Sequence, residues 1–238
     1  MMRSAREPKM AVQPGNGTLV HPERAPASEI EITTLPGLVP YLPMWRRQQA
    51  LAAARARGEI GDQLLFVEHE HVYTNGWRGD RSNLLADDAT LREIGASYHE
   101  IERGGDITYH GPGQMVAYPI IDLRAAGIGV RAYVNKLETT VIHTLAAFGV
   151  EAKAKSGIVG VWVGEAKIAA VGVKVRHGIT YHGFALNVNP DLDYFSHIVP
   201  CGLTGVTVTS LSAVLNRPVE ISAVIPACAR AFREVMRG

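Results

Sequence analysis

The chain has 238 residues, of which 47% are apolar and 20% are charged, with a formal net charge of +1. This length allows one large domain or two small ones, and the composition is that of a globular protein with a sizeable core. The charge gives no electrostatic reason to expect nucleic acid or an anionic membrane surface as a partner. No apolar run approaches the roughly 20 residues that span a membrane. Two cysteines allow at most one disulfide, and the N-terminus lacks an apolar signal core, so we expect the protein in the cytoplasm.

Residues 1–28 are rich in Pro, Gly and Ala without a hydrophobic period, which predicts a disordered tail. The remaining residues, 29–238, are expected to form one domain. Its first half should contain a strand, a helix, a buried strand, a turn-rich loop, a short helix and a further strand. We expect these elements, in that order, at residues 29–34, 41–57, 64–69, 72–80, 87–94 and 97–102.

The second half begins with a strand and an amphipathic helix, in which apolar residues recur every three or four positions. Three more strands follow, joined by two-residue turns at Gly164-Glu165 and His177-Gly178. After a long loop come a short helix and a closing helix. We expect the elements of this half at residues 115–123, 130–148, 158–164, 167–175, 179–189, 209 onward and 221–236. Strands and helices do not alternate strictly, which favours an α+β domain with a mixed sheet over a doubly wound α/β fold.

The most informative stretch is residues 102–119, ERGGDITYHGPGQMVAYP, which contains four glycines and two prolines. Both residue types disfavour helix interiors, and glycine gives a strand little to pack. The stretch suits a backbone that bends and lets a ligand approach closely. We interpret it as strand, glycine loop, strand. A hairpin loop without a ligand is the alternative, but Arg103 and His110 within the loop favour ligand binding.

Cys201 and Lys167 are the sharpest candidates for chemistry. Cys201 lies between a proline and a glycine in a predicted loop, whereas Cys228 lies on a predicted helix and should be a buried small hydrophobe. Lys167 begins an apolar strand, either as an edge lysine whose ammonium reaches water or as a cation beside a thiol. A nearby cation can lower a thiol pKa from about 8.5 to between about 3.5 and 7.5, so no histidine base is needed. Thiolates attack thioesters, so the pair indicates acyl transfer; a structural role for Cys201 is the alternative.

The histidines offer a competing interpretation. His69 and His71 are two positions apart, so on a strand they would share a face, as metal ligands can. Two ligands do not make a zinc site, however, and no CxxC or HExxH accompanies them. We therefore expect no metal. His110 and His182 are better explained as polar groups that line a pocket, with hydrogen-bonded turn histidines as the alternative. The chain has neither a G-x-x-x-x-G-K-[ST] phosphate loop nor a G-x-S-x-G elbow.

Four segments occur in the order RGGDITYHGPGQ, GEAKIAAVGV, HGFALNV and IVPCG. Together they resemble the signature blocks of the octanoyl-acyl-carrier-protein:protein octanoyltransferase (LipB) family, over residues 68–211. The resemblance implies a single domain with the biotin/lipoate ligase-like fold and no cofactor. It implies transfer of an octanoyl group from octanoyl-acyl carrier protein to a lysine of lipoyl domains, as the first step of endogenous lipoate synthesis. The implied acceptors are the lipoyl domains of 2-oxo acid dehydrogenases and the glycine-cleavage H protein.

The same resemblance implies roles for individual residues. Cys201 would hold the acyl group as a thioester, and Lys167 would lower the pKa of that thiol and exchange protons. Three segments would cradle the acyl chain, and their residues are Arg103, Gly104, Gly105, Asp106, Ile107, Thr108, Tyr109, His110, Ala170, Val171, Gly172, Gly183, Phe184 and Ala185. One rival is an ATP-dependent lipoate–protein ligase, which needs no cysteine nucleophile. The other is a non-catalytic acyl-binding module, against which the presence of Cys201 and Lys167 argues.

Overall fold

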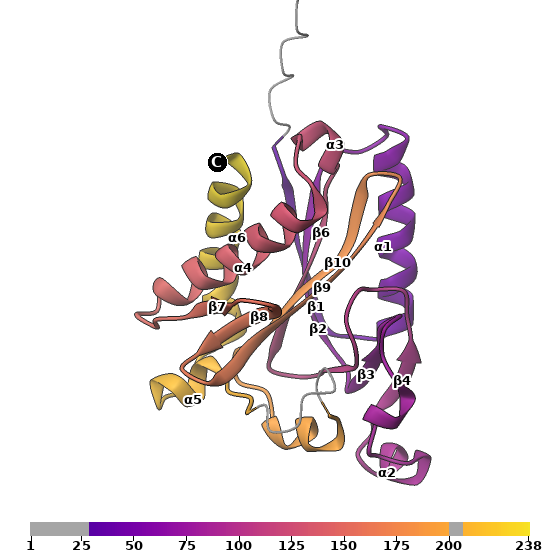
Figure 1. Ribbon diagram of the computed structural model, residues 1–238, viewed down its shortest axis with the longest axis vertical. Helices are drawn as coiled ribbons and strands as arrows, with labels where there is room; N and C mark the ends of the chain where they lie inside the picture. The colour runs from indigo at the N-terminus through magenta and orange to yellow at the C-terminus, as the bar shows by residue number, and fades with distance from the viewer. Residues whose placement is uncertain (1–28, 200–206) are drawn as a thin grey trace, which may run out of the picture.

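The computed structural model describes residues 29–199 and 207–238; the predicted tail and Cys201 lie outside these ranges. Figure 1 shows a large central sheet with helices on both faces and a small sheet at one end. The strands are β1 (Glu31–Val39), β2 (Gln63–His69), β3 (Val72–Asn75), β4 (Ser97–Glu100), β5 (Thr108–His110), β6 (Gln114–Ile120), β7 (Lys153–Lys155), β8 (Ile158–Val163), β9 (Ala166–Arg176) and β10 (Ile179–Asn187). The helices are α1 (Tyr41–Ala56), α2 (Asp88–Glu93), α3 (Leu123–Ala126), α4 (Val130–Ala146), α5 (Leu211–Leu215) and α6 (Ile221–Arg237), with 3-10 helices η1 (Arg81–Asn83) and η2 (Leu192–His197).

The central sheet has seven strands in the order β1-β2-β6-β10-β9-β8-β7. Strands β1 and β2 are parallel, and the other neighbours are antiparallel. The register of β1 shifts between Thr34 and Leu38, at Pro36 and Gly37, and the opposite edge strand β7 has only three residues. The sheet is therefore mixed, which confirms the predicted α+β class.

Side chains along the central strands point alternately to the two faces of the sheet, where they fill two separate cores. Leu64 and Phe66 of β2 pack with residues of α4 and α6, whereas Leu65 and Val67 pack with Met44 of α1. Side chains alternate between the two faces of a strand, so both sets are buried only because helices cover both faces. This explains why β2 is apolar without alternation.

The helix predicted at 130–148 is confirmed as α4. Its apolar residues Tyr133, Leu137, Val141 and Leu145 are fully buried, and Gly149 follows the helix with a φ of 75°. Glycine adopts this left-handed conformation without steric cost, which suits a helix end. The spacing of Leu137, Val141 and Leu145 therefore predicted the helix and the centre of the face that it buries, whereas Val134 and Phe148 of the same pattern are only partly buried.

Three strands lie outside the strands that the sequence predicted. One is β7, between the segments expected at 130–148 and 158–164. The expected turn-rich segment 72–80 begins with β3, and β5 lies inside the expected glycine loop. Strand β3 pairs with both β4 and β5, and all four of its residues are buried. The prediction was wrong because Asn75-Gly76 and later turn-forming residues outweighed the β-forming Val72 and Tyr73.

Within the described ranges, no helix is long and apolar enough to cross a membrane.

Candidate active site

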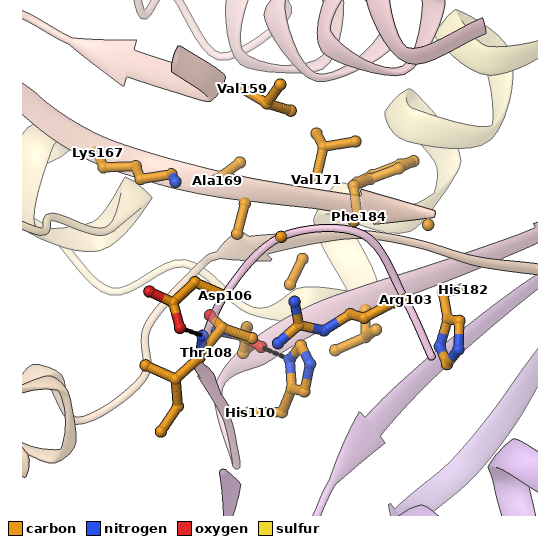
Figure 2. Close-up of a pocket in the computed structure, with 18 of the residues that line it drawn as sticks. Arg103, Asp106, Thr108, His110, Val159, Lys167, Ala169, Val171, His182 and Phe184 are labelled. Atoms are coloured by element: carbon orange, nitrogen blue, oxygen red, sulfur yellow. Dashed lines mark hydrogen bonds between the residues drawn. The ribbon is translucent and has the colours of Figure 1, made fainter. Parts of the chain in front are cut away.

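A cavity of about 490 Å³ lies between the glycine loop and the strands β9 and β10 (Figure 2). Lys167 and His182 stand at opposite ends of it, with Ala169, Val171 and Phe184 between them. Further apolar lining residues are Val116, Ile158, Val159, Ala185 and Val208. The volume falls in the range of small-molecule sites, roughly 300–1,000 Å³, and an apolar wall with a few polar groups is their usual lining.

The cavity brings together the three segments that the sequence singled out. The predicted residues that line it are Arg103, Gly105, Asp106, Ile107, Thr108, His110, Lys167, Ala170, Val171, Gly172, Gly183, Phe184 and Ala185. Gly104 and Tyr109, which were also predicted, are not among the residues that line the cavity. The amide of Gly104 donates to the Val173 carbonyl at 2.9 Å, and the fully buried Tyr109 has its hydroxyl 2.8 Å from His71 Nδ1. These two hydrogen bonds therefore fix the loop to β9 and to His71.

Arg103 holds the glycine loop against the small sheet. Its guanidinium donates to both the carbonyl and the hydroxyl oxygen of Thr74 in β3, at 2.5 and 3.0 Å. Gly172 permits the close approach of the loop to β9, because a Cβ there would lie 2.9 Å from the Gly104 carbonyl oxygen. A Cβ at Gly76 would overlap the carbonyl oxygen of Gly105. The loop is thus held between two glycines at which an added Cβ would push its backbone away.

His110 and His182 both line the cavity, as predicted from the sequence. Burial is the main cause that lowers the pKa of each to about 3, so both rings are neutral near pH 7. His110 Nδ1 lies 2.6 Å from Gln114 Oε1. The backbone of His182 has a φ of 56°, and its amide donates to Gln48 Oε1 at 2.8 Å.

The two histidines that the sequence analysis considered as metal ligands, His69 and His71, have other partners. His69 uses both ring nitrogens, at 2.7 Å from the Val39 carbonyl oxygen and 2.8 Å from the Tyr118 hydroxyl. His71 stacks on Tyr194 with ring centroids 4.1 Å apart. Among the described residues, no group of three or more His, Cys, Asp or Glu side chains could hold a metal ion.

Lys167 is fixed through its backbone to the residues that follow segment 200–206. Its amide donates to the Thr207 carbonyl at 2.8 Å, and its carbonyl accepts from the Thr209 amide at 2.9 Å. Val208, between them, lines the cavity and forms a parallel bridge with Lys167. Before the same segment, the Val199 amide donates to the Asn83 carbonyl at 2.8 Å.

Two residues around Lys167 had no signal in the sequence strong enough to be singled out. A Cβ at Gly160 of β8 would lie 2.6 Å from Lys167 Cε, so the lysine stem lies directly against this glycine. The Gly160 amide donates to Glu138 Oε1 at 2.8 Å. Burial raises the pKa of the Glu138 carboxyl, while this hydrogen bond and the charge of Lys167 oppose the rise. The only hint was a glutamate beside Leu137 on the apolar stripe of α4.

Residues 40–233 match the family model of the lipoyl protein ligase A/B catalytic domain. A relative from Solibacter usitatus (strain Ellin6076), named octanoyltransferase, is 51% identical over 178 residues, which cover 75% of this chain and 80% of the relative.

Solved structures give the fold. A lipoate–protein ligase A bound with ATP superposes with a TM-score of 0.67 at 20% identity, covering 87% of this chain and 86% of the other. A biotin protein ligase from Aquifex aeolicus superposes with a TM-score of 0.51 at 11% identity, covering 88% and 69%. These likenesses confirm the predicted biotin/lipoate ligase-like fold.

Proposed function

The chain belongs to the octanoyltransferase family of lipoyl protein ligase A/B catalytic domains, and we propose that it transfers an octanoyl group from octanoyl-acyl carrier protein to a lysine of a lipoyl domain. One observation carries the proposal: Lys167 and residues of the three predicted segments line a single, largely apolar cavity. An octanoyl chain is apolar, so removing it from water against Val171 and Phe184 supplies binding free energy. We assign the activity to one catalytic domain, residues 29–238, and place it in the cytoplasm. The acceptors are the lipoyl domains of 2-oxo acid dehydrogenases and the glycine-cleavage H protein.

We assign the nucleophile to Cys201, which lies outside the described residues. Cys228 is unsuited to the role, because it is fully buried in α6 and burial raises the pKa of its thiol to about 12. The chain that follows segment 200–206 supports the assignment, because Val208 lines the cavity and forms a bridge with Lys167. Lys167 is the cation that lowers the Cys201 pKa in this proposal.

In the first half-reaction, the Cys201 thiolate attacks the carbonyl carbon of the donor thioester. A new carbon–sulfur bond forms to Cys201, the bond to the carrier's thiolate breaks, and that thiolate takes a proton from Lys167. The octanoyl group is now a thioester of the enzyme. This step requires the ammonium of Lys167 within hydrogen-bond reach of both sulfur atoms, directly or through one water.

In the second half-reaction, the acceptor's amine attacks the same carbonyl carbon. The carbon–nitrogen bond forms, the bond to Cys201 breaks, and neutral Lys167 takes the proton that the amine releases. The overall change is thioester plus amine to amide plus thiol. An amide is more stable than a thioester, so the reaction proceeds without ATP.

The mass of the intact protein after mixing with octanoyl-acyl carrier protein tests this function. We expect a covalent octanoyl adduct on the parent and on Cys228→Ala, none on Cys201→Ser, and octanoylation of a lipoyl domain without ATP. A parent that forms no adduct and modifies the acceptor only with ATP and free octanoate would be a ligase instead. Equal loss of transfer in both cysteine variants, with folding preserved, would contradict the assignment of Cys201.

A further inference from the structure

Two buried amide side chains connect the glycine loop to the segment that pairs with Lys167. His110 Nδ1 lies 2.6 Å from Gln114 Oε1, and Gln114 Nε2 donates to Asn187 Oδ1 at 2.9 Å. Asn187 Nδ2 then donates to the Thr209 carbonyl oxygen at 3.0 Å. Gln114 begins β6 and Asn187 ends β10, where the two residues are paired across the strands. The side chains of His110, Gln114 and Asn187 and the backbone carbonyl of Thr209 thus form one continuous hydrogen-bonded path, which we call the amide relay.

The direction of the amide relay is fixed by backbone carbonyls, which can only accept. Gln114 Nε2 also donates to the Tyr109 carbonyl oxygen at 3.2 Å, so its NH₂ group must face that side. Its Oε1 therefore faces His110, and the hydrogen of the neutral His110 ring must be on Nδ1. His110 Nε2 is left with a lone pair, which makes it a hydrogen-bond acceptor at the cavity wall.

The far end of the amide relay acts on Lys167 through the backbone. Thr209 accepts from Asn187 with its carbonyl and donates with its amide to the Lys167 carbonyl at 2.9 Å. The Lys167 amide in turn donates to the Thr207 carbonyl at 2.8 Å. A shift of residues 207–209 would therefore shift the start of β9, and with it the base of the lysine side chain.

We propose that Gln114 and Asn187 are positioning residues, which hold Lys167 in register with the glycine loop and fix the ring of His110. The proposal rests on the proposed octanoyl transfer, because it assigns these residues to the geometry of that reaction. Both side chains are almost fully buried, with exposed fractions of 2% and 4%. A buried amide that loses its partner is costly, so each link constrains the next.

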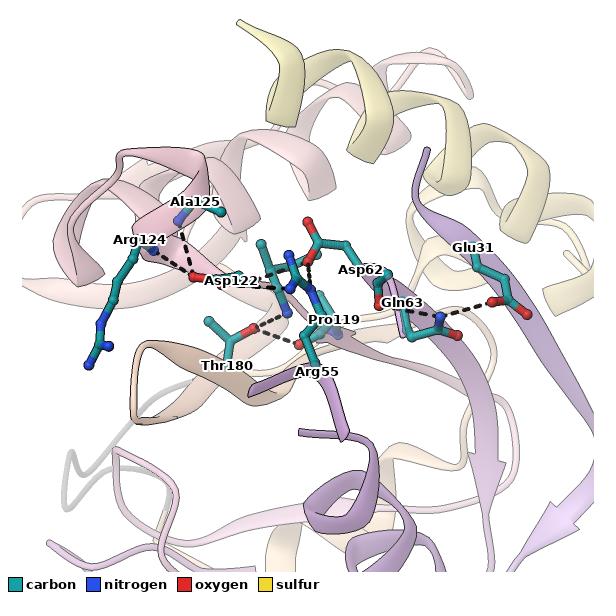
Figure 3. Close-up of polar contacts among 11 residues, drawn as sticks. Glu31, Arg55, Asp62, Gln63, Pro119, Asp122, Arg124, Ala125 and Thr180 are labelled. Atoms are coloured by element: carbon teal, nitrogen blue, oxygen red, sulfur yellow. Dashed lines mark hydrogen bonds and ion pairs between the residues drawn. The ribbon is translucent and has the colours of Figure 1, made fainter. Parts of the chain in front are cut away.

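The opposite end of the same two strands provides a matched control. The Thr180 hydroxyl of β10 donates to the Pro119 carbonyl at 2.8 Å and accepts from the Ile121 amide at 2.9 Å (Figure 3). Thr180 is fully buried and, unlike Gln114 and Asn187, does not line the cavity. Like Asn187, it joins β10 to the β6 segment through a side chain, but far from Lys167. Loss of Thr180 therefore reports what loss of a buried cross-strand hydrogen bond does to the fold alone.

The test compares Asn187→Leu, Gln114→Leu, their double variant and Thr180→Val in the full chain. It measures kcat and KM for octanoyl-acyl carrier protein, with a lipoyl domain as acceptor, and the thermal unfolding midpoint. Misplacement of a catalytic group by about 1 Å can cost about 10²-fold, so we expect kcat to fall about 10- to 100-fold in each single variant. KM should change less than threefold, and Thr180→Val should keep the parent's kcat at a similar loss of unfolding midpoint. The double variant should lose no more than the worse single variant, because both break one path.

Losses that multiply in the double variant, or a kcat within twofold of Thr180→Val in folded single variants, would overturn the proposal. If Asn187→Leu does not fold, Gln114→Leu breaks the same path at its other link and decides the question. The parent's octanoyl adduct, measured in the same series, separates the two proposals: without it the proposed function fails and the amide relay fails with it. An active parent with unaffected variants removes the amide relay alone.

Discussion

Gly160 and Lys167 lie in direct contact across the β8–β9 pair. A Cβ built on Gly160 would come within 2.6 Å of Lys167 Cε and 3.2 Å of its Nζ, and also within 2.8 Å of the Ala169 carbonyl oxygen. The hydrogen bond from the Gly160 amide to Glu138 fixes this position from the helix side. The place of the lysine ammonium therefore depends on the absence of a side chain at residue 160.

Gly160→Ala should lower octanoyl transfer by about 10²-fold, because the added methyl displaces the end of the lysine stem. The backbone cost arises from the φ of 135° and from the Ala169 carbonyl. The control is Gly164→Ala at the end of the same strand, where φ is 56° and nothing lies within 4 Å of the added Cβ. Transfer rates and unfolding midpoints should separate the two variants. Both should lose a similar amount of stability, but only Gly160→Ala should lose octanoyl transfer. Equal transfer in the two would mean that the lysine adapts.

Lys167→Met removes the charge and keeps much of the volume of the stem. Alkylation of Cys201 by iodoacetamide should then require a clearly higher pH than in the parent. Transfer should fall by about 10²–10⁴-fold, the usual contribution of general acid–base assistance, and so further than alkylation does. Lys174→Met, on the same strand but outside the cavity lining, should change neither measurement.

Lys167→Arg separates charge from proton exchange. In the proposed mechanism the guanidinium would still supply a cation at position 167, but it does not lose its proton in proteins. Alkylation should recover part of its low-pH onset, while transfer should recover little. Full transfer in this variant would show that Lys167 acts only as a fixed charge.

Gly172→Ala should disturb the glycine loop without touching Lys167. The added Cβ would lie 2.9 Å from the Gly104 carbonyl oxygen and 3.2 Å from Arg103 Cδ, so the loop must move away from β9. We expect slower formation of the octanoyl adduct and a raised KM for the octanoyl donor, because the cavity wall is displaced. Gly61→Ala, where nothing lies within 4 Å, is the matched control and should leave both unchanged. A Gly172→Ala variant with parent-like adduct kinetics would contradict this.

Stability should fall on acidification below pH 6.5. Burial lowers the folded-state pKa of His69 to about 4 and of His110 and His182 to about 3, from the ordinary histidine value of 6.5. Between these pH values the unfolded chain binds more protons than the folded one. The contribution of these histidines to the free energy of unfolding is therefore fully present above pH 6.5 and is lost progressively as the pH falls toward 3. Urea unfolding at pH 7.5, 6.5, 5.5 and 4.5 should show this slope.

His182→Asn is the informative control for that slope, because asparagine tolerates the left-handed backbone at φ 56°. Carboxylates titrate alike in the variant and in the parent. The difference between the two curves of stability against pH therefore isolates the contribution of His182. The variant should lose less stability between pH 6.5 and 4.5 than the parent does. Parallel curves would mean that His182 titrates alike in both states.

The sequence predicted those elements whose signals are local. The helix α4 follows from the spacing of Leu137, Val141 and Leu145, and the β9–β10 turn follows from His177-Gly178, where φ is 51° and 86°. Strands β3 and β5 were missed because their pairing is long-range and turn-forming residues surround them. Pairing between segments that are distant in the chain leaves no periodic pattern of apolar residues in either segment.

In the candidate site, too, the sequence predicted what depends on residue type and missed what depends on pairing between distant strands. The glycine loop and Lys167 stand out by residue type, the family resemblance implied a shared role for them, and residues of both line the cavity. Gln114 and Asn187 were not singled out, because their partnership depends on the register of β6 against β10. Gly160 was missed because its contact with Lys167 arises where the β8–β9 register shifts, between Val161 and Trp162. Residue type alone does not encode either relationship.

The two outer strands of the central sheet have a bearing on how the protein behaves at high concentration. An exposed strand edge offers unpaired amides and carbonyls to a second chain, and intermolecular β-pairing of this kind starts aggregation. On one edge, Pro36 lacks the amide that such pairing needs, and Gly37 turns the backbone with a φ of 68°. On the other edge, β7 offers only three residues, two of which are Lys153 and Lys155. Neither edge presents a long, regular template, so the sheet that forms the cavity wall is protected from extension by neighbouring molecules.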